Sequence, residues 1–316
     1  MVDRLVEEGY RVTVLDSLAH SVVEPEEYWK GLGEVSFIKC DLRRPRGECL
    51  RSFRGAFAVF HFAADPEVRA AYRRPGQQFE NNLVATWRVL EASRRAGVEV
   101  FVFASSSTVY GDPRELPTPE SHPLEPISVY GATKAGGEQL VRTYSLLYGM
   151  RGASLRYANI VGPRLRHGVI WDFIAKLRRD PRRLEVLGDG TQRKSYLYVG
   201  DAVDATMAVY NKLVQEEAGN YAVYNVGNND WITVNEIADI VAKVLGLEKV
   251  EYVYKPWGRE GRGWPGDVKL MLLDIRKITG ETGWRPTLTS REAVDLAARH
   301  MALEAAGQRG PGPSWR

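Results

Sequence analysis

The sequence predicts a doubly wound α/β fold, in which a parallel sheet lies between two layers of helices. Two observations support this prediction. Short apolar segments alternate with amphipathic helical stretches, and each segment is almost continuously apolar, as in strands buried on both faces. A third observation is that the pattern begins with a helix. We therefore expect a parallel sheet that lacks its first strand, followed by a smaller α/β lobe.

Five apolar segments are expected to form the strands of a first domain, residues 1–162. Amphipathic stretches separate them, and the clearest of these cover residues 77–95 and 129–148. The five segments are RVTVLD (11–16), VSFIKCD (35–41), AFAVFHFAA (56–64), VEVFVFASSS (98–107) and ASLRYANIVG (153–162).

The second half of the chain has shorter strands and longer loops, with helices expected near residues 201–214, 234–245 and 290–304. We assign residues 163–305 mainly to a substrate-binding lobe, interleaved with the last strands of the main sheet. The end of the chain, residues 306–316, is rich in Gly and Pro and is expected to be disordered.

Composition narrows the function classes. The 43 basic and 40 acidic side chains are interspersed and give a net charge of +3, so no nucleic-acid partner is expected. We find no apolar run long enough to cross a membrane and no signal-peptide pattern, and we predict a cytoplasmic protein. Cys40, Cys49 and the five histidines show no ligand spacing, so they are expected to be isolated structural or surface residues, with no metal site.

The most informative motif is SVYGATK, in which Tyr130 and Lys134 lie four residues apart at the start of a helical stretch. This spacing places both side chains on one helix face. A tyrosine ordinarily loses its proton near pH 10, and a neighbouring cation favours the phenolate. The pair therefore suits a base that deprotonates a hydroxyl. The spacing alone is weak evidence, because it also arises by chance.

The context of this pair adds a second observation. A buried strand ends in Ser105, Ser106 and Ser107, and hydroxyls at the carboxyl end of a sheet strand lie where open α/β sheets bind ligands. The alternative is that these serines only cap the turn that follows.

Together with other motifs along the chain, these sequence motifs resemble those of the extended short-chain dehydrogenase/reductase superfamily. Within it, they resemble the nucleotide-sugar 4-epimerases of the UDP-glucose/UDP-galactose type. The resemblance runs from residue 1 to about residue 305 and implies a Rossmann-type fold. It rests on Asp16, HFAA (61–64), Asn82, SSSTVYG (105–111), YGATK (130–134) and RYANIVGPR (156–164).

The resemblance implies a role for each catalytic residue. Tyr130 is expected to act as acid and base at the 4-hydroxyl of the sugar. Lys134 would hold the nicotinamide ribose and lower the pKa of the tyrosine, and Ser106 would hydrogen-bond the same oxygen. Hydride would pass from C4 to NAD, and the 4-keto sugar would rotate and take the hydride back on its other face.

NAD is expected rather than NADP, because Asp16 ends the second strand, where a carboxylate binds both ribose hydroxyls and repels a 2′-phosphate. An ordinary turn residue is the alternative for Asp16. The expected cofactor-binding residues are Asp16, Asp41, Leu42, Phe62, Ala63, Ala64, Asn82, Tyr130, Lys134 and Tyr157.

The substrate is expected to be a UDP-sugar whose diphosphate meets a cation. Many relatives have Arg-Asp where this chain has Lys194 and Ser195, and Trp264 stands where an arginine is frequent. Arg262 is our first choice for the cation, and a solvated basic loop is the alternative. The expected substrate-binding residues are Ser106, Ser107, Asn159, Val169, Ile170, Gln192, Arg193, Lys194, Arg262 and Asp267.

Ser107 and Thr108 distinguish two reaction types. Related sugar 4,6-dehydratases place Asp-Glu at these positions to eliminate water, whereas this chain has two hydroxyls. The sequence therefore favours a plain epimerase over a dehydratase. A homodimer is also expected, because the helices over 77–95 and 129–148 resemble those that pair in relatives.

The opening MVDRLVEEGYRVTVLD reads as the second half of a strand-helix-strand unit. The superfamily begins with a strand and GxxGxxG, whose backbone N–H groups bind the pyrophosphate. We expect either that the chain as given starts late or that the protein has lost its cofactor loop. The second explanation would make it a non-catalytic nucleotide-sugar-binding protein.

Overall fold

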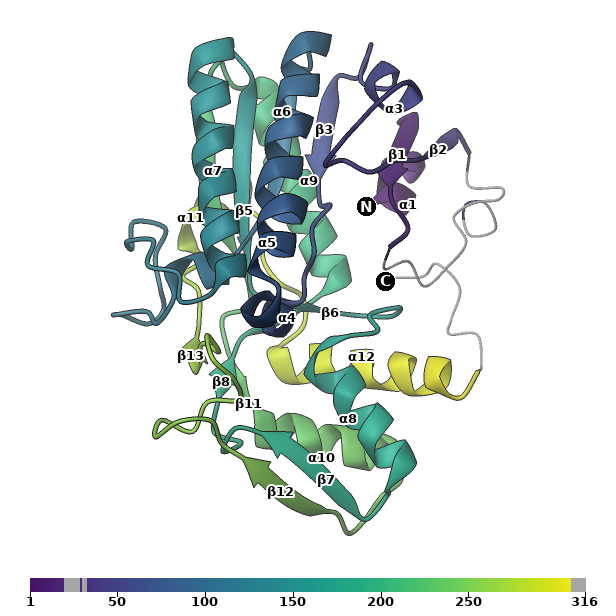
Figure 1. Cartoon of the computed structure of the whole chain (residues 1–316), viewed down its shortest axis with the longest axis vertical. Helices are drawn as coiled ribbons and strands as arrows, with labels where there is room; N and C mark the ends of the chain where they lie inside the picture. The colour runs from purple at the N-terminus through teal and green to yellow at the C-terminus, as the bar shows by residue number, and fades with distance from the viewer. Residues whose placement is uncertain (20–28, 30–32, 308–316) are drawn as a thin grey trace.

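The computed structural model describes residues 1–19, 29 and 33–307, and it divides into an upper and a lower lobe (Figure 1). The upper lobe contains a four-stranded parallel sheet in the order β10-β5-β4-β3. Its strands are β3 (Ala58–His61), β4 (Val100–Ser106), β5 (Arg151–Tyr157) and β10 (Tyr221–Val226). The predicted parallel α/β fold is confirmed.

Alternation along β4 explains why helices cover both faces of this sheet. Val100 and Val102 belong to one core cluster, which includes Val209 of α9 (Val199–Gln215), whereas Phe101 and Phe103 belong to another. The second cluster includes residues of α6 (Ala85–Ala96) and α7 (Val129–Tyr148). Successive strand residues point to opposite faces, so each face needs its own cover.

The first two strands form a separate sheet. β1 (Val12–Asp16) follows helix α1 (Val2–Glu7) and pairs in parallel with β2 (Val35–Lys39). Among the described residues, β1 has no strand partner except β2, and β3 has none except β4. β1 and β2 are thus separate from the sheet that contains β3, and a further strand between β1 and β3 stays a prediction.

Short helices complete the upper lobe. The stretch predicted as one helix over residues 77–95 is interrupted, because a π-helical segment, η1, lies between α5 and α6. The elements are α3 (Glu48–Arg51), α4 (Val68–Arg73), α5 (Pro75–Gln78), η1 (Phe79–Val84), the 3₁₀ turn η2 (Ser107–Tyr110) and α11 (Arg276–Thr282).

The lower lobe packs three helices against short strands around a second core (Figure 1). Its helices are α8 (Gly168–Arg179), α10 (Val234–Val244) and α12 (Ser290–Ala305). The strand pairs are β7 (Arg183–Leu187) with β12 (Glu251–Lys255) and β6 (Asn159–Val161) with β9 (Tyr196–Tyr198). β8 (Arg193–Lys194) lies between β11 (Ile232–Thr233) and β13 (Leu270–Met271).

The lobes are interleaved along the chain, because β10 returns from the second half to pair with β5 in the upper sheet. Within the part of the chain that the structure describes, we find no helix that is both long and apolar enough to cross a bilayer. Of the tail expected to be disordered, residues 308–316 lie outside the described residues.

The expectation that the two cysteines are isolated is wrong. Cys40 and Cys49 form a disulfide, with their Cα atoms 6.0 Å apart. The chain turns back after β2, and the backbone N–H of Cys49 donates to the carbonyl oxygen of Arg46. This turn brings the start of α3 against the end of β2, a contact that sequence spacing alone does not show.

Candidate active site

A cavity of about 600 Å³ is lined by residues of both lobes, including those at the carboxyl end of β4. One wall carries Ser106, Tyr130, Lys134 and Tyr157, and another carries Val169 and Ile170 of α8. Polar groups at the carboxyl ends of parallel strands are where open α/β sheets bind ligands. This cavity is therefore the candidate active site.

The start of α7 is seated closely against η2. The Ser128 side chain caps the helix by accepting a hydrogen bond from the Gly131 N–H at 3.1 Å. A Cβ atom on Gly131 would lie only 2.5 Å from the Thr108 carbonyl oxygen, so only glycine allows this approach. The close packing brings Tyr130, the neighbour of Gly131, to the end of β4.

Ser106 is oriented toward Tyr130. Its Oγ accepts hydrogen bonds from the Thr108 N–H (3.2 Å) and the Thr108 hydroxyl (3.0 Å), and it also bonds to Tyr130. With two hydrogen bonds accepted, Ser106 has its own proton to donate to the tyrosine oxygen. Ser106 thus has both of the roles considered for it, because it caps the turn η2 and also faces the candidate base.

Lys134 lies beneath Tyr130 and is 3% exposed. Its Nζ donates to the Ala104 carbonyl oxygen at 2.7 Å and lies 5.0 Å from the Phe103 ring centroid and 5.8 Å from that of Tyr130. Burial lowers the pKa of Lys134 to about 8, while the Glu138 carboxylate acts in the opposite direction. The lysine is therefore still mostly charged at neutral pH.

The expected lowering of the Tyr130 pKa by Lys134 is wrong. Burial raises the pKa of Tyr130 to about 12, and the hydrogen bond from Ser106 offsets only part of this effect. A phenolate in an apolar wall loses solvation, and here that loss is larger than any stabilisation from the nearby cation. Burial therefore favours the neutral, protonated form of Tyr130.

The predicted cofactor residues divide into two groups. Phe62, Ala64 and Tyr157 line the cavity with Tyr130 and Lys134. Asp16, Asp41, Leu42, Ala63 and Asn82 do not line it.

Asp16 and Asp41 both end up near the carboxyl ends of β1 and β2. Asp16 accepts a hydrogen bond from the Leu18 N–H at 2.7 Å, and Asp41 pairs with Arg43, which lowers the pKa of the Asp41 carboxyl. Leu42 packs against the core formed by α6 and α7. A carboxylate at the end of β1 fits the ribose of a dinucleotide, so the residues present fit NAD at this edge.

Asn82 is buried and holds neighbouring polar groups together. Its Oδ1 accepts from the Asp65 N–H at 2.7 Å, and its Nδ2 donates to Gln78 Oε1 at 2.7 Å and to Thr133 Oγ1 at 3.4 Å. Asn82 therefore links η1 to the first turns of α7, behind the cavity wall.

The predicted substrate residues also divide. Ser106, Ser107, Asn159, Val169, Ile170, Gln192, Lys194 and Asp267 line the cavity, whereas Arg193 and Arg262 do not.

The two arginines outside the cavity lining have other partners. Arg193 lies over the Trp231 ring, 5.2 Å from its centroid. Arg262 forms a bidentate pair with Asp112, with both N–O distances 2.9 Å, and a second ion pair with Glu260. This placement does not support the choice of Arg262 as the cation for the diphosphate.

Lys194 is a cation that does line the cavity. Its Nζ pairs with the buried Asp267 at 2.7 Å and lies 5.6 Å from the Trp264 ring centroid. The guanidinium of Arg69 lies at the same distance from that ring.

Sequence reasoning did not assign several residues that line this cavity, among them Arg69, His167, Phe173 and Trp264. Helical spacing contains a signal for Phe173, because it lies three and four residues after Ile170 and Val169 on α8. We see no comparable signal in the sequence for Arg69.

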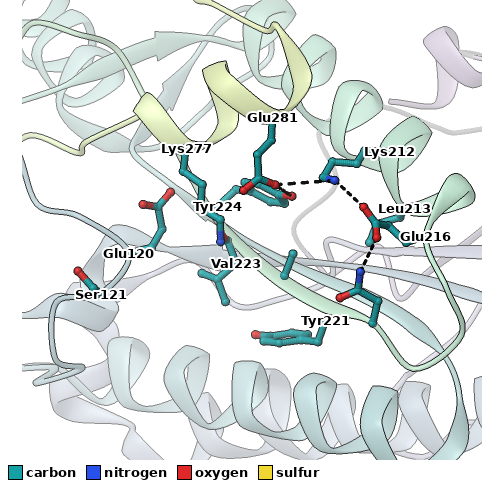
Figure 2. Close-up of a pocket in the computed structure, with 12 residues that line it drawn as sticks. Glu120, Ser121, Lys212, Leu213, Glu216, Tyr221, Val223, Tyr224, Lys277 and Glu281 are labelled. Atoms are coloured by element: carbon teal, nitrogen blue, oxygen red, sulfur yellow. Dashed lines mark hydrogen bonds and ion pairs between the residues drawn. The ribbon is translucent and has the colours of Figure 1, made fainter.

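A second cavity, of about 460 Å³, lies where β10, α9 and α11 meet (Figure 2). Its charged groups are engaged with one another or with the backbone. Glu281 accepts from the Tyr224 hydroxyl at 2.7 Å, Lys212 pairs with Glu216, and Lys277 donates to the Val223 carbonyl oxygen at 2.8 Å. This cavity lacks the Ser106, Tyr130 and Lys134 constellation.

Comparisons with known proteins agree with this site. Residues 1–227 match the NAD dependent epimerase/dehydratase family. A putative UDP-glucose 4-epimerase of Methanocaldococcus jannaschii is 32% identical over 309 residues, which cover 95% of this chain and 93% of that protein. Other relatives are named for 4-epimerisation of UDP-arabinose and UDP-glucuronate.

Two solved structures are similar over nearly the whole chain. A UDP-galactose 4-epimerase is 48% identical, with a TM-score of 0.84 and coverage of 96% of this chain and 94% of its own. The Thermus thermophilus UDP-glucose 4-epimerase in complex with NAD is 33% identical, with a TM-score of 0.79 and coverage of 95% and 94%. The chain therefore belongs to the NAD-dependent epimerase/dehydratase family, as an isomerase of the UDP-sugar 4-epimerase type.

Proposed function

We propose that this protein interconverts UDP-glucose and UDP-galactose by NAD-dependent epimerisation at C4. The observation that carries the proposal is the convergence of Ser106, Tyr130 and Lys134 on one cavity wall, with Ser107 and Thr108 beside them and no carboxylate at either position. NAD, when bound, would supply the acceptor and donor of the C4 hydride.

The chain's own residues would move the proton. Tyr130 takes the proton of the sugar 4-hydroxyl as C4 is oxidised, and it returns the proton when the ketone is reduced on the other face. Ser106 donates a hydrogen bond to the tyrosine oxygen, which favours the phenolate, and Lys134 Nζ lies 5.8 Å from the centroid of the tyrosine ring. The positive charge of a bound nicotinamide would favour the phenolate and so lower the raised pKa of Tyr130.

The remaining walls suit the nucleotide part of the substrate. Val169, Ile170 and Phe173 give one side of the cavity an apolar surface, which suits a uracil ring. Lys194 is proposed as the cation at the diphosphate, in place of Arg262, although its pairing with Asp267 leaves it only partly available. Asn159 and Gln192 line the same cavity and are proposed as hydrogen-bonding partners.

The proposal is tested by following the product. A cofactor-loaded form should convert UDP-glucose to UDP-galactose without accumulating a 4-keto-6-deoxy sugar, because Ser107 and Thr108 cannot supply the acid and base of dehydration. The product is identified by NMR and by mass. A product lighter by one water would show a dehydratase, and UDP-glucose binding without turnover at saturating NAD would favour the non-catalytic binding protein.

A homodimer is proposed from the outer surface of η1, α6 and α7. Phe79, Trp87, Leu147 and Tyr148 are between 38% and 68% exposed along these elements, which is unusual for large apolar side chains. Two copies related by a twofold axis would cover this surface. Light scattering at micromolar concentration should give a dimer, and Leu147→Glu should shift it toward monomer. A wild-type monomer under these conditions would refute the proposal.

A further inference from the structure

A buried ion pair lies behind the cavity wall that carries Ser106, Tyr130 and Lys134. Glu138 stands four residues after Lys134 on α7 and is 1% exposed, and Arg156 on β5 donates to both of its carboxylate oxygens at 2.7–3.2 Å. Neither residue lines the cavity, so neither is placed to touch a substrate there. The role proposed above for Tyr130, Lys134 and Ser106 leaves this pair without a function.

Arg156 donates further hydrogen bonds besides those to Glu138. Its Nη1 donates to the Tyr110 hydroxyl at 2.8 Å and to the Glu120 carbonyl oxygen at 3.0 Å, and the Tyr110 hydroxyl donates in turn to Asn225 Oδ1 at 2.7 Å. A buried charge pair is retained only when such extra hydrogen bonds satisfy it. The network therefore fixes the Glu138 carboxylate in one place.

Glu138 connects this network to the catalytic residues. Its Oε1 accepts a hydrogen bond from Ser105 Oγ at 2.5 Å, and Ser105 is the residue before Ser106. One helical turn earlier, Lys134 Nζ donates to the carbonyl oxygen of Ala104, the residue before Ser105. The end of β4 and the start of α7 are thus joined at two adjacent points.

The helix must also lie close to the strand for both bonds to form. A Cβ atom on Gly137 would lie 2.6 Å from the Phe103 ring, so this glycine allows the approach.

The groups that face Lys134 explain why a nearby negative charge affects the pKa of this lysine. Tyr130 and Glu138 face it from α7, His61 faces it from β3, and the Phe103 ring and Ala104 carbonyl oxygen face it from β4. Burial lowers the pKa of His61 to about 3, so this histidine is neutral. Of these groups, Glu138 is the acidic side chain whose charge raises the pKa of Lys134.

We propose that Glu138, held by Arg156, is a positioning residue that fixes Lys134 and Ser106 against Tyr130 and supplies the charge that keeps Lys134 protonated. The inference rests on the proposed function for its catalytic meaning. Its physical content, the effect of Glu138 on Lys134, is measurable in the cofactor-free protein.

The direct test is the titration of Lys134 by NMR of ¹³Cε-labelled lysine, with the resonance assigned by its absence in Lys134→Met. In Glu138→Gln the amide still accepts the Ser105 hydrogen bond but carries no charge. The midpoint for Lys134 should fall by about one pH unit, because removal of an opposite charge one helical turn away on α7 disfavours the ammonium. An unchanged or raised midpoint would overturn the proposal.

Two further variants separate this effect from a general loss of stability. Glu236→Gln makes the same change in the surface pair with Arg291 and should leave the Lys134 midpoint in place. If Glu138→Gln leaves Arg156 uncompensated and fails to fold, the double variant Glu138→Gln/Arg156→Gln removes both charges. Its midpoint should still lie below that of the wild type, and equality with the wild type would contradict the proposal.

The kinetic consequence has a defined sign. Activity needs protonated Lys134, so kcat should fall as pH rises through the lysine pKa, and this fall should occur at lower pH in Glu138→Gln than in the wild type, because the Glu138 carboxylate raises that pKa. At pH 6.5 the two proteins should differ little, and at pH 8.5 the variant should be slower by several-fold. A uniform decrease at all pH values would indicate a merely structural role. Absence of 4-epimerase activity in the wild type would refute the proposed function but leave the NMR test intact.

Discussion

Replacing Tyr130 with phenylalanine is expected to lower kcat at least about 100-fold, the usual contribution of general acid-base catalysis. The variant keeps the ring that packs at the start of α7 and removes only the oxygen that bonds Ser106. NAD affinity and melting temperature should therefore stay close to those of the wild type. Steady-state kinetics with UDP-glucose and calorimetric titration of NAD measure the two quantities separately.

The matched control for this experiment is Tyr254→Phe. Tyr254 lies on β12 in the lower lobe, where its hydroxyl donates to Asn235 Oδ1 at 3.0 Å. The Tyr254→Phe variant loses a hydroxyl outside the candidate site, so the kcat of this variant should be nearly unchanged. If Tyr130→Phe and Tyr254→Phe are equally active, another group moves the proton and the assignment of Tyr130 is incorrect.

Supplying a strand between β1 and β3, followed by a GxxGxxG loop, is expected to strengthen NAD binding by more than 100-fold. Among the described residues, β1 and β3 each have one edge without a strand partner. In a complete Rossmann-type sheet, the first strand of the fold lies between the two strands that correspond to β1 and β3. The loop adds about two charge-assisted hydrogen bonds to pyrophosphate, at about 1.5–3 kcal/mol each. Even the lower sum, about 3 kcal/mol, exceeds a 100-fold change in Kd.

The experiment adds about 15–20 residues before Met1, the length of a short strand and loop. Calorimetry gives NAD affinity, and thermal melting gives stability. A second extension with alanine in place of the loop glycines should still raise the melting temperature, because the strand pairs with β1 and β3, but it should bind NAD weakly. Equal NAD affinity with and without the glycine-containing extension would show that the cofactor is held another way.

Local sequence determined much of the fold. The helix predicted over residues 129–148 has those bounds in the structure, because its start carries a capping serine and its end is followed by Gly149 in the left-handed conformation. The spacing of Tyr130 and Lys134 placed them on one helix face for the same local reason. Ser106 was located by its position at the end of an apolar strand.

Only the tertiary structure decided which groups act together. Lys194 rather than Arg262 lines the cavity, because Asp112, which is 150 residues away along the chain, binds the guanidinium of Arg262. The partnership of Glu138 with Arg156 likewise depends on α7 packing against β5. Side-chain spacing within one element reports neighbours on that element, whereas partners from other elements are set by how loops and lobes pack.

The sequence by itself therefore determined the parallel α/β architecture and the placement of Tyr130 and Lys134 on one helix face, since both follow from periodicity and from spacing within single elements. The tertiary structure decided the protonation of Tyr130, the Cys40–Cys49 disulfide and the identity of the cations at the cavity. Each of these depends on burial or on a contact between separate elements. Burial is a property of the whole packed chain, because the desolvation of one group is produced by all the residues that surround it.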